Sequence, residues 1–88
     1  MKLGVGLPVG GAWATPDNLV RVGHQAESLG YHSLWVFQRL LYPLQPRNEY
    51  YGAPGAAWPE AFQSVLDPVV ALTWVAAHTR TIRLGASV

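Results

Sequence analysis

The side chains that could take part in chemistry come directly after short apolar runs of the chain. Gln38 and Arg39 follow the run Ser33 to Phe37, and Ser87 and Val88 close the last apolar run. An arginine guanidinium can hold an anionic group through two parallel hydrogen bonds, and a glutamine amide can both donate and accept. The ordinary alternatives are a salt bridge or a solvated loop position for Arg39 and a plain strand end for Ser87 and Val88.

Aromatic side chains gather in the segments near these residues. They supply large apolar area with a polar tip and suit a substrate pocket or a lid, although each of them also fits plain loop packing. We expect Trp13, Arg39 and Tyr42 to contact a substrate. Trp35 and Trp74 are interpreted as packing residues. The further aromatic candidates are Tyr50, Tyr51 and Trp58.

The sequence predicts neither a metal centre nor an activated nucleophile. It contains no cysteine, and the spacing of His24, His32 and His78 resembles no zinc motif. It also has no nucleophile elbow and no phosphate loop. Thr15 and Asp67 each precede a proline and are interpreted as helix caps. No residue is therefore assigned a catalytic role.

Composition restricts the function classes. The chain has 88 residues, of which 50% are hydrophobic and 12% charged, which suits one globular domain with extensive burial. A net charge of +1 with dispersed arginines gives no electrostatic case for nucleic acid. The longest apolar stretch, Val69 to Ala77, is far shorter than the roughly 18–20 residues that span a bilayer, and the amino terminus does not suit a signal peptide. We therefore expect a soluble, cytoplasmic protein without a membrane partner.

A strand, a helix and a second strand are predicted in the first half of the chain. Leu3 to Leu7 is an apolar run that predicts a buried parallel strand. Thr15-Pro16-Asp17 predicts the start of a helix that runs to about Leu29, and Gly30 suits the left-handed position after it. Ser33 to Phe37 predicts the second strand. The inner stripe of the helix is expected to be Leu19, Val22, Ala26 and Leu29.

The second half begins with an unusually long connection, from Gln38 to Leu66. Its length and aromatic content favour a lid or a binding loop over disorder, and Pro59 to Ser64 is predicted as a short helix. Asp67-Pro68 repeats the cap-plus-proline signal before a helix from Val69 to about His78. Ile82 to Ser87 predicts a third strand.

Two architectures accept repeated strand–helix units, the open doubly wound sheet and the closed (β/α)8 barrel. The dinucleotide-binding version is disfavoured, because Gly4 and Gly6 lie inside the first strand and the helix cannot start before Pro16. Three strands and two helices in a chain of this length match the number of residues per strand–helix unit in a barrel. We therefore expect an α/β fold, an incomplete (β/α)8 TIM barrel in which residues 1–88 are the truncated amino-terminal part. Its open sheet edges would favour a homo-oligomer or another form of self-association.

Four blocks of the sequence carry a family resemblance. They are Leu3–Pro8, Ala26–Val36, Leu66–Leu72 and Thr79–Gly85. Together, in this order, they resemble the start of a bacterial luciferase-like monooxygenase, and more narrowly the branch of oxidoreductases that use deazaflavin coenzyme F420. The Ala-Glu-x-Leu-Gly, Ser-Leu-Trp and Arg-Leu-Gly motifs are fairly specific for the family but not for a substrate.

The resemblance implies a barrel that binds a flavin or deazaflavin at the carboxyl ends of its strands. It implies coenzyme contacts for Gln38, Ser87 and Val88, the last two at the place of a non-proline cis peptide that backs the coenzyme ring. Much of the deazaflavin branch has an acid and a histidine where this chain has Gln38 and Arg39, so an acid–base role for this pair is in doubt.

The expected activity is transfer of a hydride between F420 and a small organic substrate. Two alternatives stay open: an FMN-dependent monooxygenase of the same family, and a catalytically silent segment that completes a barrel with another chain.

Overall fold

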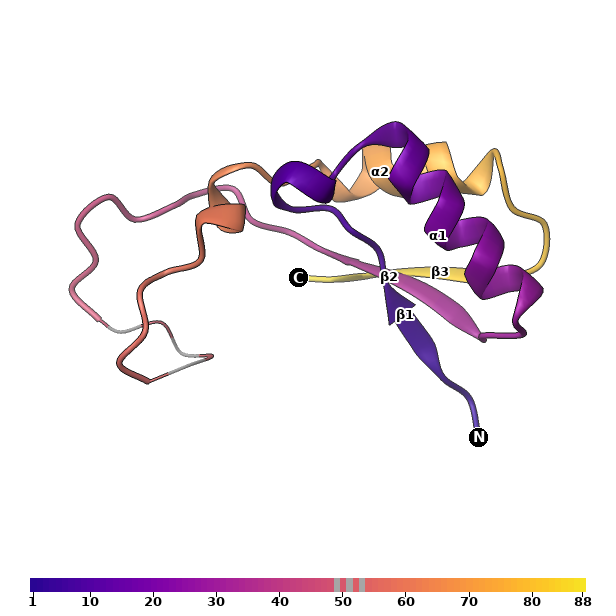
Figure 1. The fold of residues 1–88 in the computed structure, drawn as a ribbon, viewed down its shortest axis with the longest axis horizontal. Coiled ribbons are helices and arrows are strands. Elements are labelled where there is room, and N and C mark those ends of the chain that lie inside the picture. Colours follow the sequence, from indigo (N-terminus) through magenta and orange to yellow (C-terminus); the bar gives the residue numbers. More distant parts are fainter. Residues whose placement is uncertain (49, 51, 53) are drawn as a thin grey trace.

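The computed structural model describes residues 1–48, 50, 52 and 54–88, and these form one sheet with two helices on one of its faces (Figure 1). The strands are β1 (Gly4–Gly6), β2 (Ser33–Phe37) and β3 (Arg83–Ser87), in the order β1-β2-β3 and all parallel. The α-helices are α1 (Pro16–Ser28) and α2 (Pro68–Ala76), and two 3₁₀ helices, η1 (Gly11–Trp13) and η2 (Glu60–Gln63), lie in the connections. The three parallel strands and two helices predicted from the sequence are confirmed.

Both helices begin at the predicted caps. Thr15 Oγ1 accepts a hydrogen bond from the backbone N–H of Asn18 at 3.1 Å, and the Asp67 carboxylate accepts one from Val70 at 3.0 Å. Each cap is followed by a proline, whose missing N–H costs nothing at this position. Gly30 follows α1 with φ +85°, as its place after the helix predicted.

The strand register assigns alternate residues of β2 to opposite faces of the sheet. Leu34 and Val36 are buried against residues of α1 and α2 and form the centre of the core with them. Trp35 points to the other face, which no helix of the described residues covers. Its indole lies over Gly4 and Gly85, where an added Cβ would come within 2.8 Å and 2.7 Å of the ring. Packing is therefore the role of Trp35, although it stays 44% exposed.

The structure corrects the predicted burial of Leu29. Leu29 was expected on the inner stripe of α1 but is 71% exposed, because it lies beyond the last turn of the helix and past the short edge strand β1. Val69 and Val70 are also exposed, so much of the apolar surface of α2 is uncovered. α2 ends at Ala76, one half-turn before the predicted His78.

At the amino ends of the strands, a carboxylate accepts hydrogen bonds from backbone N–H groups. Glu27, near the end of α1, accepts backbone hydrogen bonds from Arg80, Thr81 and Ile82 at 2.8, 2.6 and 3.0 Å, and thereby holds the turn that leads into β3. These N–H donors, with Thr81 first, lower the pKa of the Glu27 carboxyl from 4.5 to about 2. The acid in the Ala-Glu-x-Leu-Gly motif is thus a clamp between two elements that are distant in sequence.

The two helices are also joined on their outer side. His24 Nε2 donates to the backbone carbonyl of His78 at 2.8 Å, and Trp74 Nε1 donates to the carbonyl of Pro16 at 3.0 Å. The ring of His78 packs against that of Trp74. His24, His78 and Trp74 therefore have structural roles, as predicted for Trp74.

Candidate functional site

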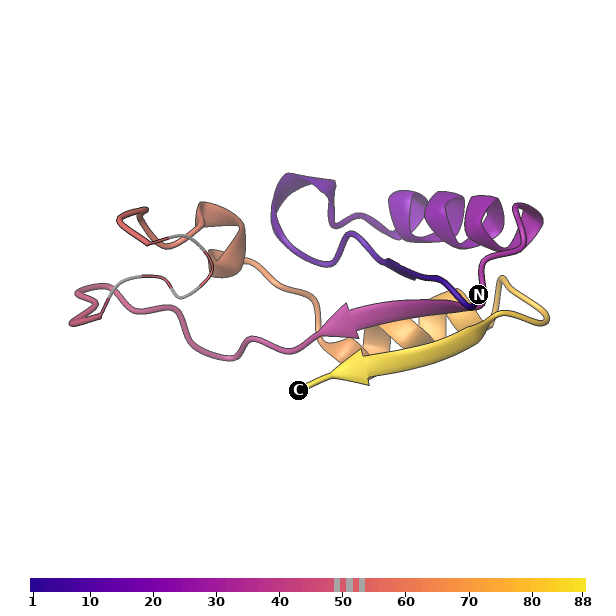
Figure 2. The ribbon, with the colours of Figure 1, turned by 90° about the horizontal axis from the view of Figure 1, so that it is seen from below.

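The three strands end at one edge of the sheet. Figure 2 shows β2 and β3 pointing the same way, with the carboxyl terminus and the long connection at that end. The backbone N–H of Gln38 donates to the carbonyl of Ser87 at 3.3 Å, and Leu7 donates to that of Trp35 at 2.8 Å. Pro8, Gln38 and Ser87 therefore follow their strands on the same side, as predicted.

A second contact ties the connection 38–66 to the segment after β1. Gly11 N–H donates to Ser64 at 2.8 Å, and Leu66 N–H donates to Val9 at 2.9 Å, on either side of an antiparallel bridge between Gly10 and Val65. Gly11 has φ +72°, and a Cβ there would lie 3.1 Å from that of Ala61. The return of the long connection is therefore fixed at the carboxyl edge.

The three residues expected to contact a coenzyme lie close together at this edge. Gln38 is half-buried, whereas Ser87 and Val88 are exposed. The peptide bonds of the described residues are all trans, so the cis bond expected at Ser87–Val88 is not present here. A non-proline cis bond costs about 3–4 kcal/mol and persists only where the surrounding structure holds it.

Arg39 is held between aromatic rings. Its guanidinium carbon lies 4.5 Å from the centre of the Phe62 ring and 5.2 Å from that of Trp58, within the range of cation–π attraction. Its Nε atom is buried and has no hydrogen-bond partner among the described residues. The surroundings of Arg39 thus differ from both ordinary alternatives, the salt bridge and the solvated loop position.

The rings that hold Arg39 belong to an aromatic cluster formed by Phe37, Tyr50, Trp58 and Phe62. Phe62 makes edge contacts with Phe37 and Tyr50, each with ring centres 5.7 Å apart, and Tyr50 lies 5.4 Å from Trp58. Tyr42 joins the cluster by donating its hydroxyl to the Trp58 carbonyl at 3.2 Å. Tyr51 lies outside the described residues. The cluster packs the connection onto the end of β2.

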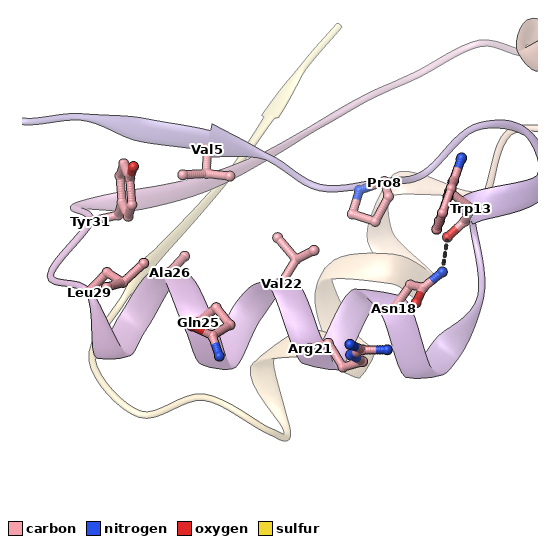
Figure 3. A pocket seen from close by; sticks show the side chains of 10 residues that line it. All are labelled: Val5, Pro8, Trp13, Asn18, Arg21, Val22, Gln25, Ala26, Leu29 and Tyr31. Carbon is pink, nitrogen blue, oxygen red and sulfur yellow. Dashed lines mark hydrogen bonds between the residues drawn. The ribbon is translucent and has the colours of Figure 1, made fainter.

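Trp13 lies apart from this cluster. With Pro8 and residues of α1 it lines an open groove of about 470 Å³ between the free edge of β1 and α1, as Figure 3 shows. The Asn18 amide donates to the backbone carbonyl of Trp13 at 3.0 Å. The structure therefore brings Arg39 and Tyr42 together around Trp58 but places the indole of Trp13, which is 74% exposed, in a different surface.

Sequence reasoning missed two of these arrangements. The pairing of Arg39 with Phe62 joins residues on either side of a long connection, and nothing in its pattern indicates which rings meet. Glu27 is different, since a single acid near a helix end and a short turn before the next strand were visible as a signal. Its partners are backbone groups, which carry no sequence signature.

The described residues form neither a metal site nor a membrane-spanning helix. In residues 1–48, 50, 52 and 54–88, no three histidine, cysteine or acidic side chains are grouped so that they could hold a metal ion. Within the same residues, no helix has the length and apolarity needed to cross a membrane.

Comparison with known proteins supplies the family. No curated protein and no solved structure matches the chain significantly. The model of one family, described as luciferase-like monooxygenase, matches residues 1–88, and this range contains both the parallel strands and the edge where Gln38 and Ser87 meet. Because the match covers the whole chain, the protein belongs to the luciferase-like monooxygenase family.

Proposed function

We propose that this chain forms the first part of a (β/α)8 barrel that moves a hydride between coenzyme F420 and a small organic substrate. Members of the family use flavin or deazaflavin coenzymes. The observation that carries the proposal is the convergence of three strand ends at one edge, where the N–H of Gln38 meets the carbonyl of Ser87 at 3.3 Å. In barrels, the residues that contact substrate and cofactor gather at this edge.

The residues at and near this edge suit a flat ring system. On the face of the sheet without helices, a Cβ added at Gly6 would meet no atom within 4 Å, so the surface there is open and free of side chains. The Gln38 amide can hydrogen-bond polar ring atoms, and Ser87 with Val88 provides exposed backbone at the end of β3. We assign these three residues to the coenzyme.

When bound, reduced deazaflavin supplies the hydride that the substrate accepts, and the protein contributes binding and orientation. Gln38 would fix the in-plane orientation of the ring through its amide. The aromatic cluster would exclude water beside it, since its rings present little polar surface. We assign Arg39 and Tyr42 to the substrate. We also assign Trp13 to the substrate, although it lines the separate groove beside α1, so this contact requires the substrate to extend into that groove.

The proposal includes three further expectations. The protein acts on a small molecule in the cytoplasm rather than on a nucleic acid or a membrane. β1 and β3 are the outer strands of the sheet, so another chain or more barrel would pair with their free edges. A homo-oligomer is one way to meet this requirement.

The experiment is a binding titration of the 88-residue chain with F420 and with FMN. We expect F420 to bind with micromolar affinity and FMN to bind much more weakly. Gln38→Ala removes one hydrogen-bonding group and should weaken F420 binding by about tenfold or less. Gln45→Ala is the matched control, because Gln45 is an exposed glutamine of the same connection and makes no hydrogen bond in the described structure.

Three results would contradict the proposal in different ways. Tighter binding of FMN would favour a flavin-dependent monooxygenase, which the family description also accommodates. Binding of neither coenzyme, together with large assemblies in solution, would favour a silent segment that associates through its sheet edges. Equal effects of Gln38→Ala and Gln45→Ala would remove Gln38 from the coenzyme site.

A further inference from the structure

Arg39 has hydrogen-bonding capacity that the protein does not use. A guanidinium carries five N–H donors, and within the described part of the chain none of those of Arg39 is hydrogen-bonded. Its Nε is also shielded from water, and an unsatisfied buried donor costs about 1–3 kcal/mol. An acceptor supplied from outside the chain would remove this cost.

The aromatic rings keep the guanidinium ready for such an acceptor. The guanidinium carbon lies over the ring of Phe62 at 4.5 Å and over that of Trp58 at 5.2 Å, and these cation–π contacts use none of its N–H donors. A side chain held in this way loses little further rotational freedom when it binds. Arg39 is therefore arranged as a planar donor group with restricted motion.

The four acidic residues that the structure describes do not provide the missing acceptor. Glu27 is bound to three backbone N–H groups at the opposite end of the strands, and Asp67 caps α2. Asp17 lies in the first turn of α1. Glu60 is close in sequence to Phe62 but makes no ion pair with Arg39 in the described structure. None of the four described acids therefore pairs with the positive charge of Arg39.

The position of Arg39 matches the proposed reaction site. It is the second residue after β2, next to Gln38, whose backbone contacts Ser87 at the end of β3. The neighbouring surface is apolar, formed by Phe37 and Phe62 of the aromatic cluster. An anionic group at Arg39 would therefore lie beside apolar surface and near the open face of the sheet.

We propose that Arg39 binds an oxyanion of the substrate, a carboxylate or a phosphate ester, through the unused N–H donors of its guanidinium. The inference deepens the proposed function and rests on it, because it gives that reaction an anionic substrate with an apolar body. Carboxylate and phosphate share the geometry that accepts two parallel hydrogen bonds from arginine.

The test observes the Nε–H signal of Arg39 by nitrogen-resolved NMR on the 88-residue chain. The probes are benzoate, phenyl phosphate and the neutral benzamide. Either anion should shift this signal on titration, and benzamide should not. Arg39→Lys keeps the charge and the cation–π contact but loses the planar fork, and the affinity measured by calorimetry should fall by about tenfold. Arg47→Lys, an exposed arginine of the same connection, is the control and should change nothing.

The anion that binds more tightly identifies the group as carboxylate or phosphate. Absence of a shift with both anions, or equal affinities for the Arg39→Lys and parent chains, would overturn the proposal. A probe displaced by saturating F420 would overturn it as well, since Arg39 would then hold an anionic group of the coenzyme. Failure of F420 to bind while the anions still require Arg39 would contradict the proposed reaction and support the anion site.

Discussion

The two ends of the β-sheet are built differently. At the amino ends of the strands, Glu27 receives three backbone hydrogen bonds, and the turn before β3 is short. At the carboxyl ends, the connection 38–66 is long, Ser87 and Val88 are exposed, and Arg39 has unused donors. The first end satisfies its polar groups internally, and the second leaves them available. The proposed barrel requires this division, with stability at the amino ends of the strands and binding at their carboxyl ends.

The largest expected effect on stability comes from the hydrophobic core, which lies between the two ends of the sheet. Leu34 is fully buried between the sheet and both helices, whereas Leu40, six residues on and past the carboxyl edge, is 79% exposed. Leu34→Ala should lower the free energy of unfolding by about 3 kcal/mol, through lost burial and a cavity. Leu40→Ala should change it by less than about 0.5 kcal/mol. Urea unfolding followed by circular dichroism measures both, and similar losses for the two variants would contradict the structure.

A smaller effect is expected from the clamp at the amino ends. Glu27→Gln keeps the shape of the side chain but places an NH₂ group or a weaker acceptor before three N–H donors, so it should lower the urea midpoint. Glu60→Gln makes the same chemical change at an exposed position near the carboxyl edge. It should leave the midpoint unchanged. A clamp that contributes nothing would give coincident curves for the three proteins.

The cap of α2 is a single hydrogen bond and should matter less than the clamp. Asp67→Ala removes the acceptor of the Val70 N–H and should cost about 1 kcal/mol of stability. Asp67→Asn preserves an acceptor and should recover most of the loss. Thermal unfolding of the three proteins checks this order. Equal losses for alanine and asparagine would mean that the negative charge, rather than the hydrogen bond, stabilises the helix start.

The smallest expected effect is the contribution of Glu27 to the pH dependence of stability. The folded pKa of Glu27 is about 2, below its ordinary 4.5, so the unfolded chain binds this proton more readily. The contribution of Glu27 is therefore complete above the unfolded pKa and falls as the pH drops from 4.5 toward 2. Between about pH 6 and about pH 3.5, the parent chain should lose more stability than Glu27→Gln. Parallel pH profiles for the two proteins would remove Glu27 as the cause.

The elements of the fold could be predicted because their signals are local. Thr15 and Asp67 each stand before a proline, Gly30 follows a helix, and Leu34 to Phe37 is an uninterrupted apolar run. Backbone conformation and short-range hydrogen bonds decide these features, so a single sequence contains them. The convergence of the strand ends follows from parallel topology alone.

The environment of the site could not be predicted in the same way. Which rings surround Arg39 depends on how a long connection returns to the sheet, and several aromatic residues were equally suitable candidates. Leu29 shows the related failure for burial, since helical periodicity indicates a face but not where the covering strand ends. Both cases depend on packing between distant segments, which periodicity does not specify.

The bridge between Gly10 and Val65 has a consequence for how such proteins diverge. Because this bridge and its flanking hydrogen bonds fix the far end of the connection, residues between Leu40 and Trp58 can change in number without moving the strand ends. Doubling a flexible loop costs only about 0.6 kcal/mol of closure entropy. Evolution can therefore replace this stretch as a unit. Such a change alters which molecules reach the carboxyl edge of the sheet, while the strands and helices stay the same.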